Sequence, residues 1–523
     1  MVPGDQRPTK VAPVGPPTVS VSTPASIPTR NSSLYDLKLL LNDPPPPPPL
    51  TPQLTTSLPS TNDKKSWDFT SIDSEVSVES PEFEYATLRE RLRDYMFLNA
   101  ITTSPSSPNL STDLNGNMSI DAQLLNWTKA INEFQHTSSS SGDNYSDDNK
   151  LLSADEKLVL LTRYVTEIGP WLDMFDHQCY FTSTLSVMAE DESVLYAILT
   201  ISSRQRDKLQ NHKPGSELTY GLYERSLASL LPKVRQIPDA RVIASCVILC
   251  CFEMMASDPS VTWKKHLQGC AALFRVSEMH GFCGRLRQAV FWCFARMDVM
   301  HSISAKTSTV IPCERWLPPG YSVNKAKNLF LLPQSNLTAA RDMYANYIVF
   351  LLARVCDTVY STDITPERFE SEWIQLYTEL DRWWQERPAE MKPVVTQYTE
   401  NCPFPSILFC VTPAISGTQM FHTAVILLMK FKTRVLRPLP VIQTDPVMRK
   451  SLIWHAKCVV GISLANGHHG CLNNALQPIW VAGKFMSSKE EQQVIVDLLQ
   501  KIEDTTGWST GWRIQDLRDH WSE

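Results

Sequence analysis

From about Leu151 onward, apolar residues return every three or four positions almost without interruption. This spacing places them on one face of an α-helix, whereas the strict alternation that is typical of a strand is sparse. No repeat of fixed period is present, so a regular solenoid is not supported. The sequence therefore predicts an all-α fold, with residues 151–523 forming one large domain. Helices are expected at 191–209, 241–256, 262–276, 286–303, 339–356, 366–387, 414–432 and 446–465.

Several helix ends are marked by their residue types. Ser153, with Glu156 three positions later, is typical of a capping box, in which each side chain binds a backbone N–H of the other residue. Ser487 and Ser488 precede Glu490 and Glu491 by the same three positions and predict the start of another helix. Gly507 is expected to end that helix, because glycine adopts the left-handed cap conformation at little cost.

Residues 1–150 have a different composition and are predicted to be a mostly disordered Pro/Ser-rich and acidic region. They hold 11 Lys/Arg against 18 Asp/Glu, a net charge of −7. The run Pro44 to Pro49 favours polyproline II, which cannot form a packed core. Short helices are expected at 82–99 and 121–135. The chain thus divides into this region and the helical domain.

Within the first region, four aromatic side chains lie in an acidic setting between Ser66 and Ala86. This stretch holds six acidic residues and no basic one. Acidic and aromatic residues interleaved in this way are typical of a disordered activation segment, because the charges keep the aromatic groups in water and available to a partner. An acidic linker whose aromatics dock onto the helical domain is the alternative. The candidate activation segment comprises Trp67, Phe69, Phe83 and Tyr85.

The remaining features exclude several function classes. No apolar stretch reaches the length of a membrane span and no signal peptide is present, so a soluble intracellular protein without a membrane partner is expected. The 13 cysteines all lie at or beyond Cys179, none spaced as CxxC, and are expected to be reduced and mostly buried. No GxGxxG, GxxxxGK[ST], GxSxG or HExxH motif occurs, so no enzyme is predicted.

Two groups of potential metal ligands stand out, and neither is predicted to hold a metal. His266 and Cys270 lie four residues apart on one expected helix, but two ligands do not complete a site. His468, His469 and Cys471 form the densest cluster, which we place in a Gly-rich loop. An unrecognised enzyme built around that loop is the only catalytic alternative. We expect no metal or cofactor within this chain.

Several strings resemble, in order, the fungal-specific transcription factor domain over roughly residues 155–523. They include GPWLDMFD at 169–176, DESVLYAILTISSRQR at 191–206, FWCFARMDV at 291–299 and a tryptophan-rich helix at 373–388. The matching positions are expected to have structural roles, as buried aromatic anchors or as partners of buried polar groups. They include Trp171, Phe175, Trp263, His266, Gly269, Trp292, Arg296, Asp298 and Trp508.

The resemblance implies a nuclear regulator of RNA polymerase II genes whose helical domain modulates activity, for example by sensing a metabolite. It implies no catalytic residue. The partners that it implies are a second copy or a related regulator, as a homodimer or heterodimer, and the transcription machinery. Promoter DNA would be contacted indirectly or through a module missing from this chain.

The chain departs from the family at its amino terminus. Members usually begin with a zinc binuclear cluster, in which six cysteine thiolates hold two zinc ions. Here the first 178 residues contain no cysteine, so zinc is expected only if a cluster lies upstream of Met1. The alternative is a natural cluster-free adaptor or repressor that heterodimerises with a zinc cluster regulator. In either case residues 1–523 are expected not to bind DNA with sequence specificity.

Overall fold

The structure is a computed structural model of the chain. It describes residues 152–210, 215–234, 238–256, 262–334, 336–400, 402–432 and 445–522. These residues are mainly helical, which confirms the predicted all-α fold. The candidate activation segment and the two short helices predicted at 82–99 and 121–135 lie outside the described residues. The boundary at residue 150 therefore stays a prediction.

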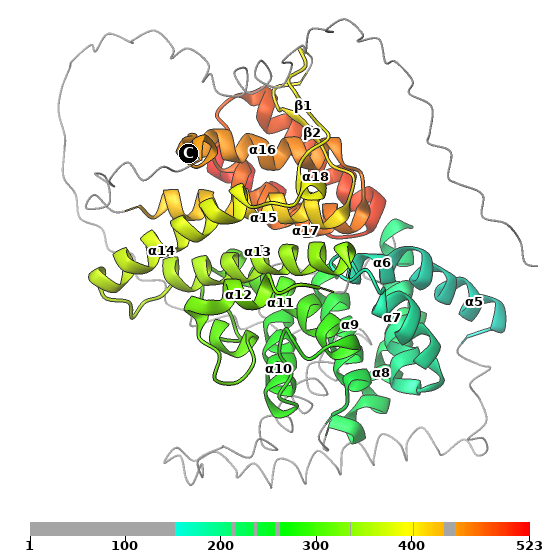
Figure 1. Ribbon diagram of the computed structural model, residues 1–523. Coiled ribbons are helices and arrows are strands. Elements are labelled where there is room, and N and C mark those ends of the chain that lie inside the picture. Colours follow the sequence, from blue (N-terminus) through cyan, green and yellow to red (C-terminus); the bar gives the residue numbers. More distant parts are fainter. Residues whose placement is uncertain are drawn as a thin grey trace, which may run out of the picture. The chain divides into compact units, whose positions relative to one another are not determined.

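The helices keep the labels of Figure 1. The first seven span α5 (Ala154–Arg163), α6 (Gly169–Leu172), α7 (Glu192–Leu209), α8 (Glu217–Val234), α9 (Ala240–Ala256), α10 (Thr262–Val276) and α11 (Arg285–Ala305). The others span α12 (Ala326–Phe330), α13 (Leu337–Val359), α14 (Pro366–Gln385), α15 (Thr412–Lys430), α16 (Leu452–Ala465), α17 (His469–Gly483), α18 (Lys489–Thr506) and α19 (Gly511–Ser522). Most bounds agree with the predicted ranges to within a few residues.

One predicted helix is divided in two. The range 446–465 begins with a single 3₁₀ turn, Pro446–Arg449, and continues as α16 from Leu452. Ser451 separates the two because its backbone is extended and its hydroxyl accepts a hydrogen bond from the Trp454 N–H. A serine in this conformation is a helix cap, so the periodic pattern crosses a real helix start.

The predicted caps at the two ends of the helical region are largely confirmed. The Ser153 hydroxyl accepts from the Glu156 N–H while the Glu156 carboxylate accepts from the Ser153 N–H, which completes the capping box. Gly507 ends α18 at φ 79°, in the left-handed region. Ser488 is the residue that precedes the first turn of α18, as predicted, although its side chain makes no capping hydrogen bond.

The described residues also contain two short strands that the sequence analysis did not predict. β1 (Val395–Gln397) pairs antiparallel with β2 (Ser406–Leu408), and Thr396 lies opposite Ile407. β2 lies against α16. Three-residue strands contain too few alternating residues to be distinguished from the helical pattern around them.

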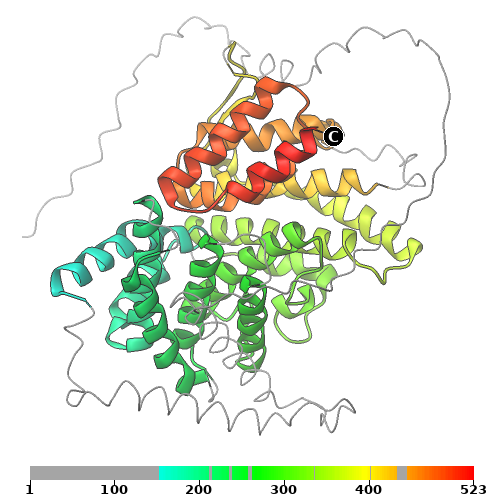
Figure 2. The same cartoon turned by 180° about the vertical axis from the view of Figure 1, so that it is seen from behind.

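Helix α13 lies at the centre of the described helices. It contacts α11 on one side and α14 and α15 on the other, and Figure 1 shows α9, α10 and α11 below it with α15 to α17 above. α17 in turn contacts α6, α11, α18 and α19, so it joins the carboxyl-terminal helices to the amino-terminal ones. Figure 2, which shows the molecule from behind, shows α18 and α19 in red beside each other. The meeting of α6, α11, α17 and α19 creates the site described below.

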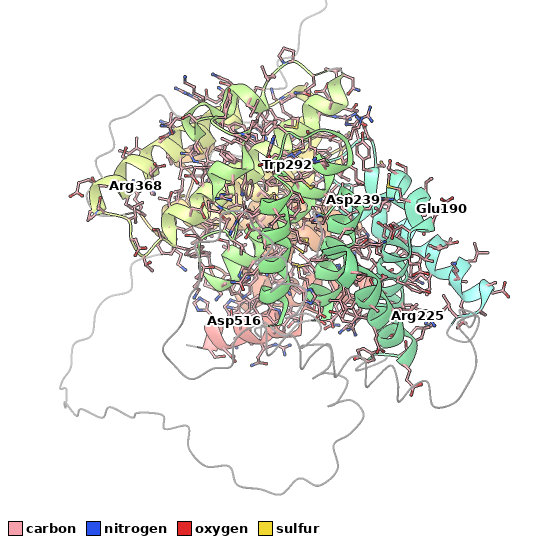
Figure 3. All side chains as sticks on the ribbon, turned by 90° about the horizontal axis from the view of Figure 1, so that it is seen from below. Glu190, Arg225, Asp239, Trp292, Arg368 and Asp516 are labelled. Atoms are coloured by element: carbon pink, nitrogen blue, oxygen red, sulfur yellow. The ribbon has the colours of Figure 1, made fainter. Side chains whose placement is uncertain are left out.

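A cluster of aromatic rings anchors the core beneath α13. Trp292 of α11 is 2% exposed, and its ring meets Trp316 edge to face with centroids 6.0 Å apart. Its indole N–H donates to the Gly281 carbonyl at 2.8 Å. Figure 3 labels Trp292 within the crowded interior. Among the residues that the structure describes, no helix is both long and apolar enough to cross a membrane.

Candidate functional site

A pocket of about 70 Å³ lies where α6, α7, α9 and α11 meet α17 and α19. Holding one water takes roughly 10–15 Å³, so this volume accommodates a molecule of several non-hydrogen atoms. Most of the wall is apolar, with Ile168, Met254, Met300 and Leu476 among its residues. A mainly apolar wall with a few placed polar groups is typical of a small-molecule site.

Helix α6 contributes Trp171 to the wall, and a tight turn holds it there. A Cβ on Gly169 would lie 2.6 Å from the Thr182 hydroxyl oxygen, so only glycine permits this approach. The Asp173 carboxylate accepts from the N–H groups of Phe181 and Thr182 at 2.8 and 2.7 Å. Burial raises the pKa of Asp173 to about 6. These contacts tie α6 to the segment that follows it.

Arg296 enters the pocket from α11 and is only 4% exposed. Its Nη2 donates to the Leu172 carbonyl at 2.7 Å, and its guanidinium carbon lies 5.1 Å from the centre of the Phe175 ring. The carbonyl and the ring face partly compensate the buried charge. The structure thus brings together three residues of the family motifs, Trp171, Phe175 and Arg296.

Arg513 enters from α19 and is 8% exposed. Its Nη1 donates to the Ser509 carbonyl at 2.9 Å, and its Nε points to Gln477 Oε1 at 3.4 Å. Burial lowers its pKa to about 9, against an opposing effect of the Glu503 charge. Among the residues that the structure describes, two arginines, Arg296 and Arg513, line the pocket, and no aspartate or glutamate does.

Trp508 reaches the pocket through the turn that follows α18. Gly507 reverses the chain there, and the Ser509 N–H donates to the Met255 carbonyl of α9 at 3.2 Å. The Trp508 indole Nε1 is buried and makes no hydrogen bond within the described part of the chain. The same holds for both amide atoms of Asn473, which comes from α17. A buried polar atom without a partner is unfavourable, so these atoms are available to a ligand.

The other family-motif residues lie outside the pocket and have structural contacts. His266 Nε2 is 3.2 Å from the Tyr223 hydroxyl and 3.8 Å from Glu253 Oε1, all in the interior. Gly269 is buried on the same helix, α10. Trp263 also belongs to α10, where the structure gives the backbone but does not describe this side chain.

Asp298, also outside the pocket, fixes the segment after α11. Its two carboxylate oxygens accept from the Val310 and Ile311 N–H groups at 2.8 and 3.0 Å. Burial raises its pKa to about 7, and the nearby Asp357 adds to the shift. Asp298 thereby holds residues 310–311 against α11.

We predict that Asp298 makes the stability of the fold pH-dependent. Its folded pKa of about 7 lies above the ordinary value of 3.8, so the folded state binds more protons between these values. Its contribution to the free energy of unfolding therefore falls as pH rises from about 4 to about 7 and is level above that. Asp298→Asn removes this pH-dependent contribution. In urea unfolding, the difference in the free energy of unfolding between the wild type and the variant should therefore decrease from about pH 4 to about pH 7. A difference in the free energy of unfolding that stays constant from about pH 4 to about pH 7 would contradict this prediction.

The loop predicted around His468, His469 and Cys471 was wrong, because α17 begins at His469. Gly470, which suggested a loop, lies in the first turn of α17. Glycine suits this position because a Cβ there would lie 3.0 Å from the Met174 side chain. Cys471 is buried, and burial raises the pKa of its thiol to about 12. Over the described ranges, no three His, Cys, Asp or Glu side chains are placed to share a metal ion.

Sequence reasoning missed Asn473, Gln477 and Arg513 as site residues. The sequence feature that could have indicated them is a polar residue among the apolar residues of a helix. Gln477, for example, lies between Leu476 and Pro478, and Arg513 precedes Ile514. This feature is only a weak indication of a site. Many surface helices carry such a residue, and only the packing of α17 on α19 shows that these side chains face inward.

A comparison with protein families assigns the chain to one family. The family model described as "Fungal specific transcription factor domain" matches residues 159–522. A curated relative, "Transcription activator AMTR1" of Alternaria alternata, is 22% identical over a 500-residue alignment that covers 71% of this chain. The chain spans 64% of that relative's length. No solved structure matches.

Proposed function

Because the chain belongs to the fungal-specific transcription factor domain family, we propose that it is a nuclear regulator of RNA polymerase II genes. The observation that carries this proposal is the family match over residues 159–522, which extends through nearly all of the described helices. The name of the curated relative, a transcription activator, supports it. The match also points away from an enzyme, in agreement with the prediction from the sequence.

In this proposal the helical region receives a regulatory signal. The pocket is formed by helices far apart in sequence, with Arg296 on α11, Asn473 on α17 and Arg513 on α19. A ligand that contacts all three favours the arrangement in which they are close. Such differential binding is the requirement for a ligand to shift a conformational equilibrium.

The candidate activation segment is proposed to recruit the transcription machinery. Its aromatic residues, among them Trp67 and Phe83, are held in water by the surrounding acidic residues. In the alternative, these aromatics dock onto the helical domain and the segment is only a linker. The two readings differ in whether the segment activates transcription when it is placed at a promoter.

DNA reading is proposed to come from outside residues 1–523, either through a zinc cluster module or through a related regulator bound as a dimer. The support is that the first 178 residues contain no cysteine to hold such a cluster. If the chain has no such module, it acts as an adaptor or repressor that heterodimerises with a regulator that does.

We predict that purified residues 1–523 show no sequence-specific DNA binding at physiological salt. Specific binding requires base-edge contacts in a groove in addition to phosphate contacts, and no motif of this chain supplies them. Fluorescence anisotropy with a pool of random duplexes, followed by selection and sequencing, measures this directly. Enrichment of one sequence with tight, salt-resistant binding would contradict the prediction.

The proposed function is tested by tethering. The full chain is fused to a foreign DNA-binding domain in a fungal reporter strain, and the reporter transcript is compared with that of the DNA-binding domain alone. A regulator that recruits the transcription machinery raises the transcript several-fold. Silence, or repression that requires a second family member, would favour the adaptor reading.

A further inference from the structure

We propose that the pocket between α6, α11, α17 and α19 binds a small hydroxycarboxylate, whose carboxylate faces Arg296 and Arg513 and whose hydroxyl meets the Asn473 amide. This inference rests on the proposed function and deepens it, because it names the chemical class of the regulatory signal.

The charge of the pocket selects an anion. Arg296 and Arg513 are both more than nine-tenths buried, and the described residues of the wall include no carboxylate to pair with them. The acid whose charge acts on Arg513 is engaged elsewhere, since the Glu503 carboxylate accepts from the Thr510 N–H and hydroxyl at 2.8 and 2.7 Å. Asp176, near Arg296, accepts from backbone N–H groups of its own turn. The two guanidinium charges are thus only partly compensated.

The arginines have donors left for such an anion. A guanidinium group carries five N–H donors. Within the described residues, Arg296 donates one hydrogen bond through Nη2, and Arg513 donates through Nε and Nη1. A carboxylate fits the planar fork of a guanidinium group well, because its two oxygens accept parallel hydrogen bonds.

The unpartnered atoms define the rest of the ligand. Trp508 Nε1 and Asn473 Nδ2 are donors, so they suit further lone pairs of the carboxylate. Asn473 Oδ1 is an acceptor and requires a donor, which a carboxylate lacks and a hydroxyl group supplies. A hydroxycarboxylate therefore satisfies all three atoms, whereas a simple carboxylate leaves the Asn473 oxygen without a partner.

The size and the wall set the carbon skeleton. A volume of about 70 Å³ favours a ligand of a few non-hydrogen atoms over a nucleotide or a sugar phosphate. The wall around the polar groups is apolar, with Met297 and Met300 on α11 and Leu476 on α17. Such a wall favours a short alkyl group over a second charge, which makes inorganic phosphate a poor occupant.

The test measures binding to the purified full chain by calorimetry and by thermal unfolding. The probes are lactate and 2-hydroxybutyrate, with propionate, propionamide, 1,2-propanediol and inorganic phosphate as comparisons. We expect the hydroxycarboxylates to bind best, propionate more weakly, and the uncharged molecules not at all. No binding by either hydroxycarboxylate, or phosphate binding as tight as lactate, would overturn the inference.

Two variants test the site itself. Arg513→Met should lower lactate affinity about ten- to a hundredfold, because a charged hydrogen-bonded partner is lost. Arg518→Met removes an exposed arginine from the same helix and should leave affinity unchanged. Asn473→Leu covers the case in which the Arg513 variant does not fold. It removes two unpartnered atoms, so it should keep or raise the unfolding temperature while lactate affinity falls. Unchanged affinity in Asn473→Leu and Arg513→Met would overturn the site.

This inference and the proposed function fail in different ways. If the tethered chain changes the reporter but no hydroxycarboxylate binds the purified chain, only the ligand class is wrong. If lactate binds but the tethered chain neither activates nor represses the reporter, with or without added lactate and with or without a second family member, the proposed function is wrong and the pocket serves another purpose.

Discussion

Gly461→Ala is expected to destabilise the fold by about 3 kcal/mol, which for a domain of ordinary stability is a large part of the free energy of unfolding. Gly461 lies inside α16, where a Cβ would be 2.0 Å from the Pro405 carbonyl oxygen. That oxygen belongs to the backbone just before β2, so it cannot rotate away as a side chain would. Relief requires α16 and the strand pair to separate. Chemical unfolding followed by circular dichroism measures the loss.

Gly417→Ala is the matched control for this prediction. Gly417 is also buried inside a helix, α15, but an added methyl group would meet Met391, Ile348 and Trp383 at 3.5 to 3.8 Å, which is ordinary contact. Alanine is favoured over glycine in a helix interior by up to about 1 kcal/mol, so this variant should be neutral or more stable than the wild type. If both substitutions change the free energy of unfolding equally, the backbone at Gly461 does not approach Pro405 as closely as described.

Replacing the four aromatic residues of the candidate activation segment by alanine is expected to lower tethered reporter transcription about tenfold or more. Truncation of an anchor side chain at an interface lowers the binding free energy by over 1 kcal/mol, and 1.4 kcal/mol corresponds to a tenfold change in affinity. The substitution keeps all six acidic residues of the segment, so charge alone would not sustain the activity. The positions are Trp67, Phe69, Phe83 and Tyr85.

The control for that experiment changes four serines of the same stretch to alanine and should leave transcription unchanged. Immunoblotting must show equal amounts of all the fusions. If the aromatic variant activates as well as the wild type at equal abundance, the segment is a linker and activation comes from elsewhere in the chain. The serines are Ser71, Ser74, Ser77 and Ser80.

The helices could be predicted from the sequence because their signal is local. The apolar period in 191–209 requires only its own residues, and α7 spans Glu192–Leu209 with Asp191 as its cap. The break at Ser451 was missed because the apolar period continues across it, and the cap is visible only in the hydrogen bond to Trp454. Where local chemistry and periodicity disagree, the sequence does not show which one prevails.

The pocket could not be predicted, because it depends on which helix faces meet. Arg296 matched the family motif, but Asn473 and Arg513 come from helices that start more than one hundred residues later in the chain. The period of a helix shows which side is apolar and does not show its neighbour. In the same way, the sequence shows a glycine at position 461, and only the structure shows the Pro405 carbonyl that requires it.

The most direct test of the proposal that this chain regulates transcription is nascent RNA sequencing in the fungus that carries it. The chain is rapidly depleted, and the strain is complemented with the wild type or with Gly461→Ala. We predict that synthesis of a discrete set of messenger RNAs changes soon after depletion and is restored by the wild type but not by the variant. Nascent transcription that is unaffected by depletion, across growth with and without a small hydroxycarboxylate as carbon source, would contradict the proposal.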